Sequence, residues 1–229
     1  MRIIFVRHGH PDYEKDCLTP LGHRQARAAA ERLKGEGIER IFSSPMGRAR
    51  ETAAYTAQAL GLEVTALDFM HEIRWGAVDG EPIAHDGHPW NTALDMVGAQ
   101  EDLLRPDWAD RPPFDRNRAA GYAKMIAREM DDFMASLGYA REGLYYRVTG
   151  QPYGTVAVFS HGGSSSAMLS RLFNLPFPFV CASMPADFTS VTVVSLTKEQ
   201  GALVAPQLEL FADAAHIRNA DKAEISFGL

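Results

Sequence analysis

Cysteine is scarce in this sequence, which contains only Cys17 and Cys181 among its 229 residues. One pair cannot make a disulfide framework, and two cysteines so far apart do not form the closely spaced pairs that bind metals. We therefore favour reduced thiols in a cytoplasmic protein over a single disulfide bridge.

Long apolar runs are also missing. The apolar stretch that ends before Arg7 is too short for the hydrophobic region of a signal peptide. No run approaches the ~18 residues that are needed to cross a bilayer. We therefore expect a cytoplasmic protein that does not associate with membranes.

Positive charge is not in excess. The chain has 23 Lys and Arg residues against 29 Asp and Glu residues, which gives a formal net charge of −6. A protein of this charge has no general attraction for nucleic acid or for anionic membranes, so neither is an expected partner. Any anion-binding site in this chain has to be built locally from a few cations.

What the chain does have is the composition of an ordinary globular protein, with 46% hydrophobic and 23% charged residues. Its first third alternates between strand and helix signals, and Thr19 followed by Pro20 is a typical helix start. This alternation predicts an α/β fold of three layers, α/β/α, with a mostly parallel central sheet. The predicted strands are 2–6, 40–43 and 63–66, and the second helix is expected to end at Gly61.

The pattern changes between about 82 and 152. Residues 82–118 are rich in Pro, Trp, Asp and His with weak periodicity, and an amphipathic helix follows that includes Tyr122, Ile126 and Phe133. We expect a single domain over 1–229 with this helical insertion lying over the active site. Beyond it we predict a strand at 155–159, a turn at 160–166, a helix at 167–173 and strands at 190–196 and 202–208.

Two histidines directly follow predicted strands, His8 after the first and His161 after a late one. Another strand end leads into Arg48. A single histidine in such a place is more often a hydrogen-bonded turn residue than a catalyst. However, ligands of open α/β sheets bind at the carboxyl ends of the strands, so these groups share one rim. Together with Arg7 they predict a site for an anion.

Four motifs occur in the order VRHG at 6–9, SSPMGRARET at 43–52, HEIRWGAVDGEP at 71–82 and FSHGG at 159–163. In their residues and their order they resemble the histidine phosphatase (phosphoglycerate mutase-like) superfamily, in particular its phosphatases. A further segment, LTPLGHRQA, opens the first predicted helix, and FADAAHI at 211–217 loosely resembles a closing motif of family phosphatases.

The resemblance implies a metal-independent phosphomonoesterase. His8 would be the nucleophile that forms a phosphohistidine, Arg7, Arg48 and His161 would hold the phosphate, and Glu72 would be the general acid and base. A neutral imidazole can attack phosphorus and form a covalent intermediate, and arginine grips two phosphate oxygens at once. No metal or other cofactor is expected, because cationic side chains neutralise the phosphate.

Two further residues are candidates for binding the substrate. Gly162 follows His161, and glycine lets the backbone approach a ligand closely. His10 takes a position where the family more often has Glu, Gln or another polar residue. The expected partner is a small phosphorylated metabolite, and the tryptophans Trp75, Trp90 and Trp108 are core residues or substrate contacts.

Three alternatives remain open at this point. His8, His10, His85, His88 and His161 could form a metal-dependent hydrolase site, although Arg7 and Arg48 would then repel the cation. A phosphoglycerate mutase-type phosphotransferase is the second, and the short segment from His10 to Leu18 favours hydrolysis over it. The third is a phosphate-binding module without turnover. A homodimer, common among relatives, is also an alternative to a monomer.

Overall fold

The computed structural model describes residues 1–218 of the chain. They fold into two compact units. The first, here called the sheet unit, contains Met1–His71, Asp132–His161 and the chain from Ala186, and the second, the helical unit, contains Glu72–Asp131 and Gly162–Pro185. The prediction of one domain with an insertion at about 82–152 stays a prediction.

The sheet unit is built on a six-stranded sheet within residues 1–218, in the order β11-β9-β1-β8-β4-β5. Strands β1, β8, β4 and β5 run parallel, whereas β9 is antiparallel to both β1 and β11. The predicted α/β fold with a mostly parallel sheet is confirmed. The strands are β1 (Arg2–Arg7), β4 (Ile38–Ser43), β5 (Val64–Ala66), β8 (Thr155–Ser160), β9 (Val191–Ser195) and β11 (Gln207–Asp213).

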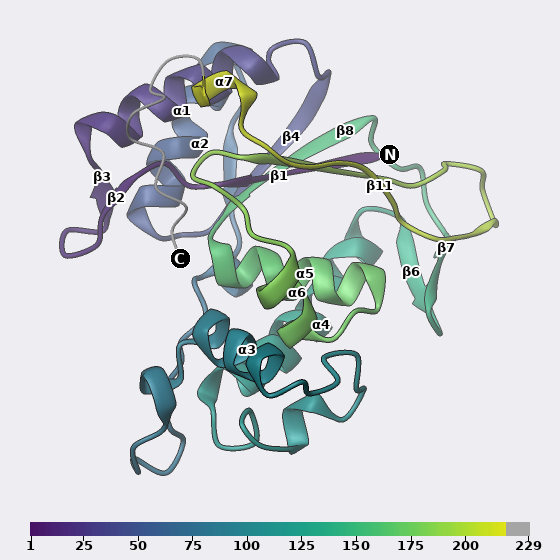
Figure 1. Ribbon diagram of the computed structural model, residues 1–229. Helices are drawn as coiled ribbons and strands as arrows, with labels where there is room; N and C mark the ends of the chain where they lie inside the picture. Colours follow the sequence, from purple (N-terminus) through teal and green to yellow (C-terminus); the bar gives the residue numbers. More distant parts are fainter. Residues whose placement is uncertain (219–229) are drawn as a thin grey trace. The chain divides into compact units, whose positions relative to one another are not determined.

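Helices α1 (Pro20–Leu33), α2 (Gly47–Leu60) and α7 (Ala215–Arg218) belong to this unit, and α1 packs against α2 and α7 (Figure 1). Thr19 caps α1 by accepting a hydrogen bond from the Gly22 N–H at 3.2 Å, with Pro20 at the first helical position. Gly61 ends α2 with a φ of 68°. Both predicted helix boundaries are confirmed. Helices and sheet share a buried cluster that includes Ile4, Leu33, Ile41, Ala53 and Phe159.

Two small sheets complete the sheet unit. A hairpin of β2 (Pro11–Asp12) and β3 (Cys17–Leu18) follows β1, and β6 (Tyr139–Glu142), β7 (Tyr145–Val148) and β10 (Leu203–Val204) form the other. The predicted strand at 202–208 is wrong, because its residues divide between β10 and β11 in different sheets. Pro206 lies between these strands and has no N–H for a ladder, which explains the break.

The helical unit contains α3 (Pro89–Gly98), α5 (Gly162–Phe173), α6 (Phe177–Ser183) and most of α4 (Arg118–Ser136). Short 3-10 turns lie at Ala84–Gly87 and Trp108–Asp110 in this unit and at Asp68–Met70 in the sheet unit. The predicted turn at 160–166 is wrong, because α5 begins at Gly162. The weak periodicity of 82–118 also concealed α3, a short helix that buries Ala93 and Met96.

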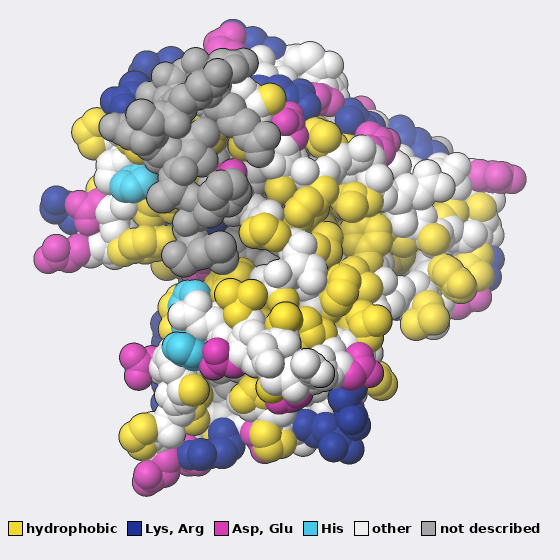
Figure 2. All heavy atoms as spheres, viewed as in Figure 1, with side chains coloured by type: hydrophobic (Ala, Val, Ile, Leu, Met, Phe, Trp, Pro, Cys, Tyr) yellow, Lys and Arg dark blue, Asp and Glu magenta, His cyan; other side chains and the backbone are white. Residues whose placement is uncertain are grey.

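Charged side chains of both signs are interspersed on the face of the molecule shown in Figure 2. This distribution agrees with the nearly balanced counts of acidic and basic residues. None of the helices within residues 1–218 is long and apolar enough to span a membrane.

Candidate active site

The carboxyl ends of three neighbouring strands bring the predicted basic residues together in the sheet unit. The parallel register places Arg7 of β1 opposite Ser160 of β8, and Phe159 opposite Ser43 of β4. The chain continues past these pairs with backbone hydrogen bonds of 2.9 Å, from the His8 N–H to Ser160 O and from the Ser44 N–H to Phe159 O. His8 and His161 therefore leave adjacent strands at the same level.

The basic side chains at this edge are almost completely buried. His8 is 1% exposed, Arg48 4% and His161 0%. The ring centroids of His8 and His161 are 5.1 Å apart, and the Arg48 Nε lies 3.3 Å from His8 Nε2. The structure therefore gathers His8, Arg48 and His161 into one cluster, and Arg7 directly precedes His8 on the chain.

Hydrogen bonds define the protonation of His8. Its Nδ1 lies 2.8 Å from the Gly9 carbonyl oxygen, which only accepts, so Nδ1 carries the proton. Nε2 is then the unprotonated nitrogen, and it accepts from Arg48 Nε. Burial, followed by the charge of Arg7, lowers the pKa of His8 well below its ordinary value of 6.5. His8 is therefore a neutral imidazole whose Nε2 lone pair points at a cation.

His161 lies against the end of β4. Its Nε2 is 2.8 Å from the hydroxyl of Ser44, which also accepts from the Met46 N–H at 3.2 Å. Burial is the main cause that lowers the pKa of His161 well below 6.5, followed by the charges of His8 and Arg48. The ring is therefore neutral before an anion binds, and it keeps one N–H donor.

Asp16 is the residue of this cluster that sequence reasoning missed. It lies in the β2–β3 hairpin with a φ of 51°, a conformation that aspartate tolerates better than most residues. Its carboxylate accepts from Arg48 Nη1 at 2.5 Å and from the Gly47 N–H at 2.7 Å. It therefore fixes Arg48 at the start of α2. A Cβ on Gly47 would lie 2.1 Å from the Asp16 carbonyl oxygen, so this approach requires glycine.

Arg7 is held by the segment that precedes β9, the strand that pairs with β1 on the side away from β8. Its Nη1 donates to the Ala186 carbonyl oxygen at 2.6 Å, and its guanidinium lies 4.3 Å from the ring centroid of Phe188. Its Nε is buried and has no hydrogen-bond partner within residues 1–218. This nitrogen is a donor to which a bound anion can supply an acceptor.

His10 belongs to the same neighbourhood but is tied to α1. Its backbone N–H donates to Gln25 Oε1 at 2.7 Å, and its ring Nδ1 lies 2.9 Å from Thr19 Oγ1. Its ring packs edge-on against Phe188 at 5.5 Å. These bonds orient His10, so its role in binding the substrate stays a prediction.

Glu72 and Gly162 lie in the helical unit. Glu72 Oε1 accepts from the Ile73 N–H at 3.0 Å and from the Ser164 N–H, in the first turn of α5, at 3.1 Å. A Cβ on Gly163 would lie 2.6 Å from this oxygen, so the contact requires glycine. The carboxylate is therefore fixed to α5, and its role relative to His8 stays a prediction, as does that of Gly162.

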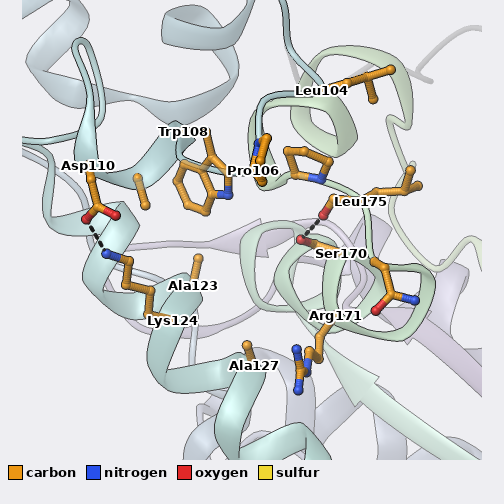
Figure 3. Close-up of a pocket in the computed structure, with 13 residues that line it drawn as sticks. Leu104, Pro106, Trp108, Asp110, Ala123, Lys124, Ala127, Ser170, Arg171 and Leu175 are labelled. Carbon is orange, nitrogen blue, oxygen red and sulfur yellow. Dashed lines mark hydrogen bonds and ion pairs between the residues drawn. The ribbon is translucent and has the colours of Figure 1, made fainter. Parts of the chain in front are cut away.

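A pocket of about 390 Å³ lies within the helical unit and is lined by none of the predicted phosphate-binding residues (Figure 3). Lys124 at its wall is paired with Asp110 at 2.7 Å, and Arg171 is paired with Asp131. Both cations are therefore compensated by carboxylates. The pocket does not have the excess of positive charge that the cluster around His8 has.

The metal-dependent alternative has no ligand set in the described part of the chain. Within residues 1–218, no group of three or more His, Cys, Asp and Glu side chains is placed to hold a metal ion. His8 and His10 follow one another closely in sequence, but His10 is bonded to Thr19 rather than directed at a shared centre with His8.

The fold and the cluster define an α/β protein with a buried basic site at the carboxyl edge of a mostly parallel sheet. Residues 3–208 match the histidine phosphatase superfamily (branch 1), and the chain belongs to that family. The family predicted from the four motifs is confirmed.

Curated relatives include proteins described as probable phosphoglycerate mutase. The protein from Yersinia enterocolitica is 33% identical over 92 residues, which are 36% of this chain and 43% of that protein. The match therefore spans less than half the length of that relative. The protein from Proteus mirabilis is 26% identical over 185 residues, covering 77% of this chain and 76% of its own length.

Several solved structures with the same fold are described as phosphatases. A phosphoserine phosphatase variant from Entamoeba histolytica has a TM-score of 0.60 and 21% identity, covering 94% of this chain and 98% of that one. The α-ribazole phosphatase from Shigella flexneri has a TM-score of 0.60 and 16% identity, with coverages of 93% and 97%. At these identities the likeness establishes the fold alone.

Proposed function

We propose that the chain is a metal-independent phosphomonoesterase that forms a phosphohistidine on His8. The observation that supports this most is the protonation of His8. Its Nδ1 proton is held by the Gly9 carbonyl, and its unprotonated Nε2 faces Arg48 at 3.3 Å. A buried neutral imidazole next to two arginines is suited to attack a bound phosphoryl group.

In the first step, the Nε2 lone pair attacks phosphorus while the ester P–O bond breaks. The attack makes the imidazole ring positive, and the Nδ1–H to Gly9 O hydrogen bond strengthens as the charge develops. Arg7 and Arg48 balance the charge on the equatorial oxygens of the phosphoryl group, which is where catalysis of this reaction acts. Removing one such donor typically costs about 10²–10³ in rate.

The leaving oxygen needs a proton, and we propose that Glu72 donates it. In the second step the Glu72 carboxylate removes a proton from the attacking water as the P–N bond breaks. This releases inorganic phosphate and restores neutral His8. A positioned acid or base of this kind is typically worth about 10²–10⁴ in rate.

His161 is assigned to the phosphate as a donor. Its pKa is lowered in the free protein by burial and by neighbouring positive charge. A bound phosphate dianion reverses the local charge and favours the protonated ring. Proton uptake by His161 on binding phosphate is therefore part of the proposal.

The substrate class that we propose is a small phosphorylated metabolite, hydrolysed in the cytoplasm. A phosphoglycerate mutase-type activity is the second candidate. The Proteus mirabilis relative, which matches this chain over most of its length, is described as a probable phosphoglycerate mutase. The hairpin from His10 to Leu18 is short, which favours hydrolysis. Measuring 2- and 3-phosphoglycerate interconversion directly separates the two.

The proposal is tested by assaying hydrolysis of an aryl phosphate and of a panel of phosphorylated metabolites, in a metal chelator. The wild-type protein is expected to release inorganic phosphate, and His8→Ala is expected to abolish this release. Turnover by His8→Ala at the wild-type rate, or turnover only after a metal is added, would refute the proposal.

A further inference from the structure

Two aromatic side chains of the sheet unit flank the ring of His8. Tyr13, in the β2–β3 hairpin, meets it edge-on with the centroids 6.5 Å apart, and Phe188, just before β9, lies 5.5 Å away. These two residues are far apart in the sequence. The antiparallel pairing of β9 with β1 brings the start of β9 to the end of β1, and therefore Phe188 to His8.

Each ring also lies beside the guanidinium of one arginine of the cluster. The Arg48 Cζ lies 5.4 Å from the Tyr13 centroid, and the Arg7 Cζ lies 4.3 Å from the Phe188 centroid. An aromatic ring attracts the face of a guanidinium, whereas the N–H donors lie in its plane. The contacts place aromatic surface beside the two arginines, and Arg7 Nε, which has no hydrogen-bond partner within residues 1–218, is left for a phosphate oxygen.

Tyr13 is 65% exposed, although His8 and Arg48 next to it are almost completely buried. Its hydroxyl makes no hydrogen bond within residues 1–218. The turn that bears it is ordered by Asp12, whose Oδ1 accepts from the Glu14 and Lys15 N–H groups at 3.2 and 3.1 Å. The turn therefore holds the ring at the surface, where it contacts His8 and Arg48 and is largely open to water.

We propose that Tyr13 and Phe188 bind the leaving group of the substrate, and that the enzyme prefers phosphate monoesters of flat, apolar alcohols, such as aryl or heteroaryl phosphates. The proposal rests on the proposed function for its site. A planar leaving group that extends from the phosphoryl group along Tyr13 or Phe188 gains aromatic contacts. A flexible polar alcohol gains none.

The alternative role for the rings is to support the two arginines and nothing more. In that case, removing a ring weakens the binding of every phosphate ester to the same degree. Selectivity between leaving groups therefore distinguishes the two roles, whereas the absolute rate does not.

The test compares kcat/KM for 2-naphthyl phosphate with kcat/KM for glycerol 2-phosphate. The two esters differ in leaving-group chemistry, but this difference cancels when their ratio is compared between variants. Tyr13→Ala is expected to lower the ratio about 2- to 12-fold, the value of one aromatic contact. Tyr13→Phe is expected to keep it, and Phe188→Leu, checked for folding by thermal melting, is expected to lower it.

Tyr145→Ala is the matched control, because Tyr145 is an exposed tyrosine of the same unit at the start of β7. It is expected to show the wild-type ratio. If Tyr13→Ala and Phe188→Leu also show that ratio, the rings do not select the leaving group and the proposal is wrong.

A binding measurement separates this proposal from the proposed function. In a His8→Ala background, calorimetry is expected to show tighter binding of 2-naphthyl phosphate than of inorganic phosphate. Adding Tyr13→Ala is expected to reduce that excess about 2- to 12-fold. If the wild-type protein hydrolyses no ester but these binding differences are observed, the aromatic site is supported and the proposed phosphatase activity is refuted. Equal binding of both ligands would overturn the aromatic site.

Discussion

Asp16 acts on the cluster through Arg48 rather than through the phosphoryl group. Its carboxylate joins Arg48 Nη1 to the first N–H of α2, at 2.5 and 2.7 Å. Those two bonds leave Arg48 Nε directed at His8 Nε2. A residue that no family motif contains therefore sets the direction of a motif arginine.

Replacing Asp16 tests this positioning role. Asp16→Asn keeps the shape but removes the charge and one acceptor, so Arg48 loses its fixed direction. We expect kcat to fall about 10-fold, in keeping with about 1.5 kcal/mol for a hydrogen bond to a charged group. Glu14→Gln, the same charge change at an exposed position of the same hairpin, is the control. Equal kcat values for the two variants would contradict the role.

Glu72 is tested by its dependence on the leaving group. If it protonates the leaving oxygen, Glu72→Gln should slow esters of weakly acidic alcohols about 10²–10⁴-fold and nitrophenyl esters far less. The measurement is the slope of log kcat/KM against the pKa of the leaving alcohol. Glu81→Gln, at an exposed carboxylate of the same unit, should keep the wild-type slope. Equal slowing of all esters would show that Glu72 is not the acid.

The sequence predicted the residues that occur in motifs at strand ends. The cluster of His8, Arg48 and His161 follows from their places after β1, in the first turn of α2 and after β8. The contacts of Asp16 and Phe188 could not be predicted in this way. They join segments far apart in the chain, and nothing in the spacing of an aspartate or a phenylalanine marks such a contact.

At the scale of the elements, the end of α2 is set by one glycine. Gly61 has a φ of 68°, and a Cβ built on it meets nothing within 4 Å. The cost of alanine there is therefore that of the backbone conformation alone.

Gly61→Ala should lower the free energy of unfolding by about 1 kcal/mol, because a side chain disfavours the left-handed conformation. Gly35→Ala is the control, since a Cβ there also meets nothing and its φ lies outside the positive range. Urea denaturation of both variants measures the difference. A Gly61→Ala protein as stable as Gly35→Ala would contradict the assignment of this helix end.

Elements with strong local signals could be predicted, whereas those formed by distant pairing could not. Thr19 and Pro20 mark the start of α1, and Gly61 marks the end of α2. Strands β6 and β7 were not predicted, because their pairing depends on contacts rather than on a long apolar run. The start of α5 was missed because glycines and serines usually favour turns.

At the scale of the whole molecule, buried histidines make stability depend on pH. Burial lowers the pKa of both His8 and His161 well below 6.5 in the folded state. Below about pH 6.5 the unfolded chain therefore binds protons that the folded protein does not. The stability from these residues is fully present above pH 6.5 and is lost as the pH falls.

We expect the free energy of unfolding to decrease between pH 7 and pH 5, with each of the two histidines contributing up to about 1.4 kcal/mol per pH unit. His8→Asn should reduce the slope by about one proton. Gln58→Asn, at an exposed position of α2 without a titratable group, should leave the slope unchanged. Denaturant melts across this pH range give the slopes, and a flat wild-type profile would contradict the prediction.

The most direct test of the central claim is to trap the phosphorylated enzyme. The protein is mixed with an aryl phosphate labelled in its phosphoryl group, quenched in alkali after milliseconds and examined by ³¹P NMR and peptide mapping. We predict an acid-labile phosphate on His8, bound to Nε2 because the Gly9 carbonyl holds Nδ1. A hydrolysing enzyme that never shows phosphate on His8, or shows it on Nδ1, would contradict this account.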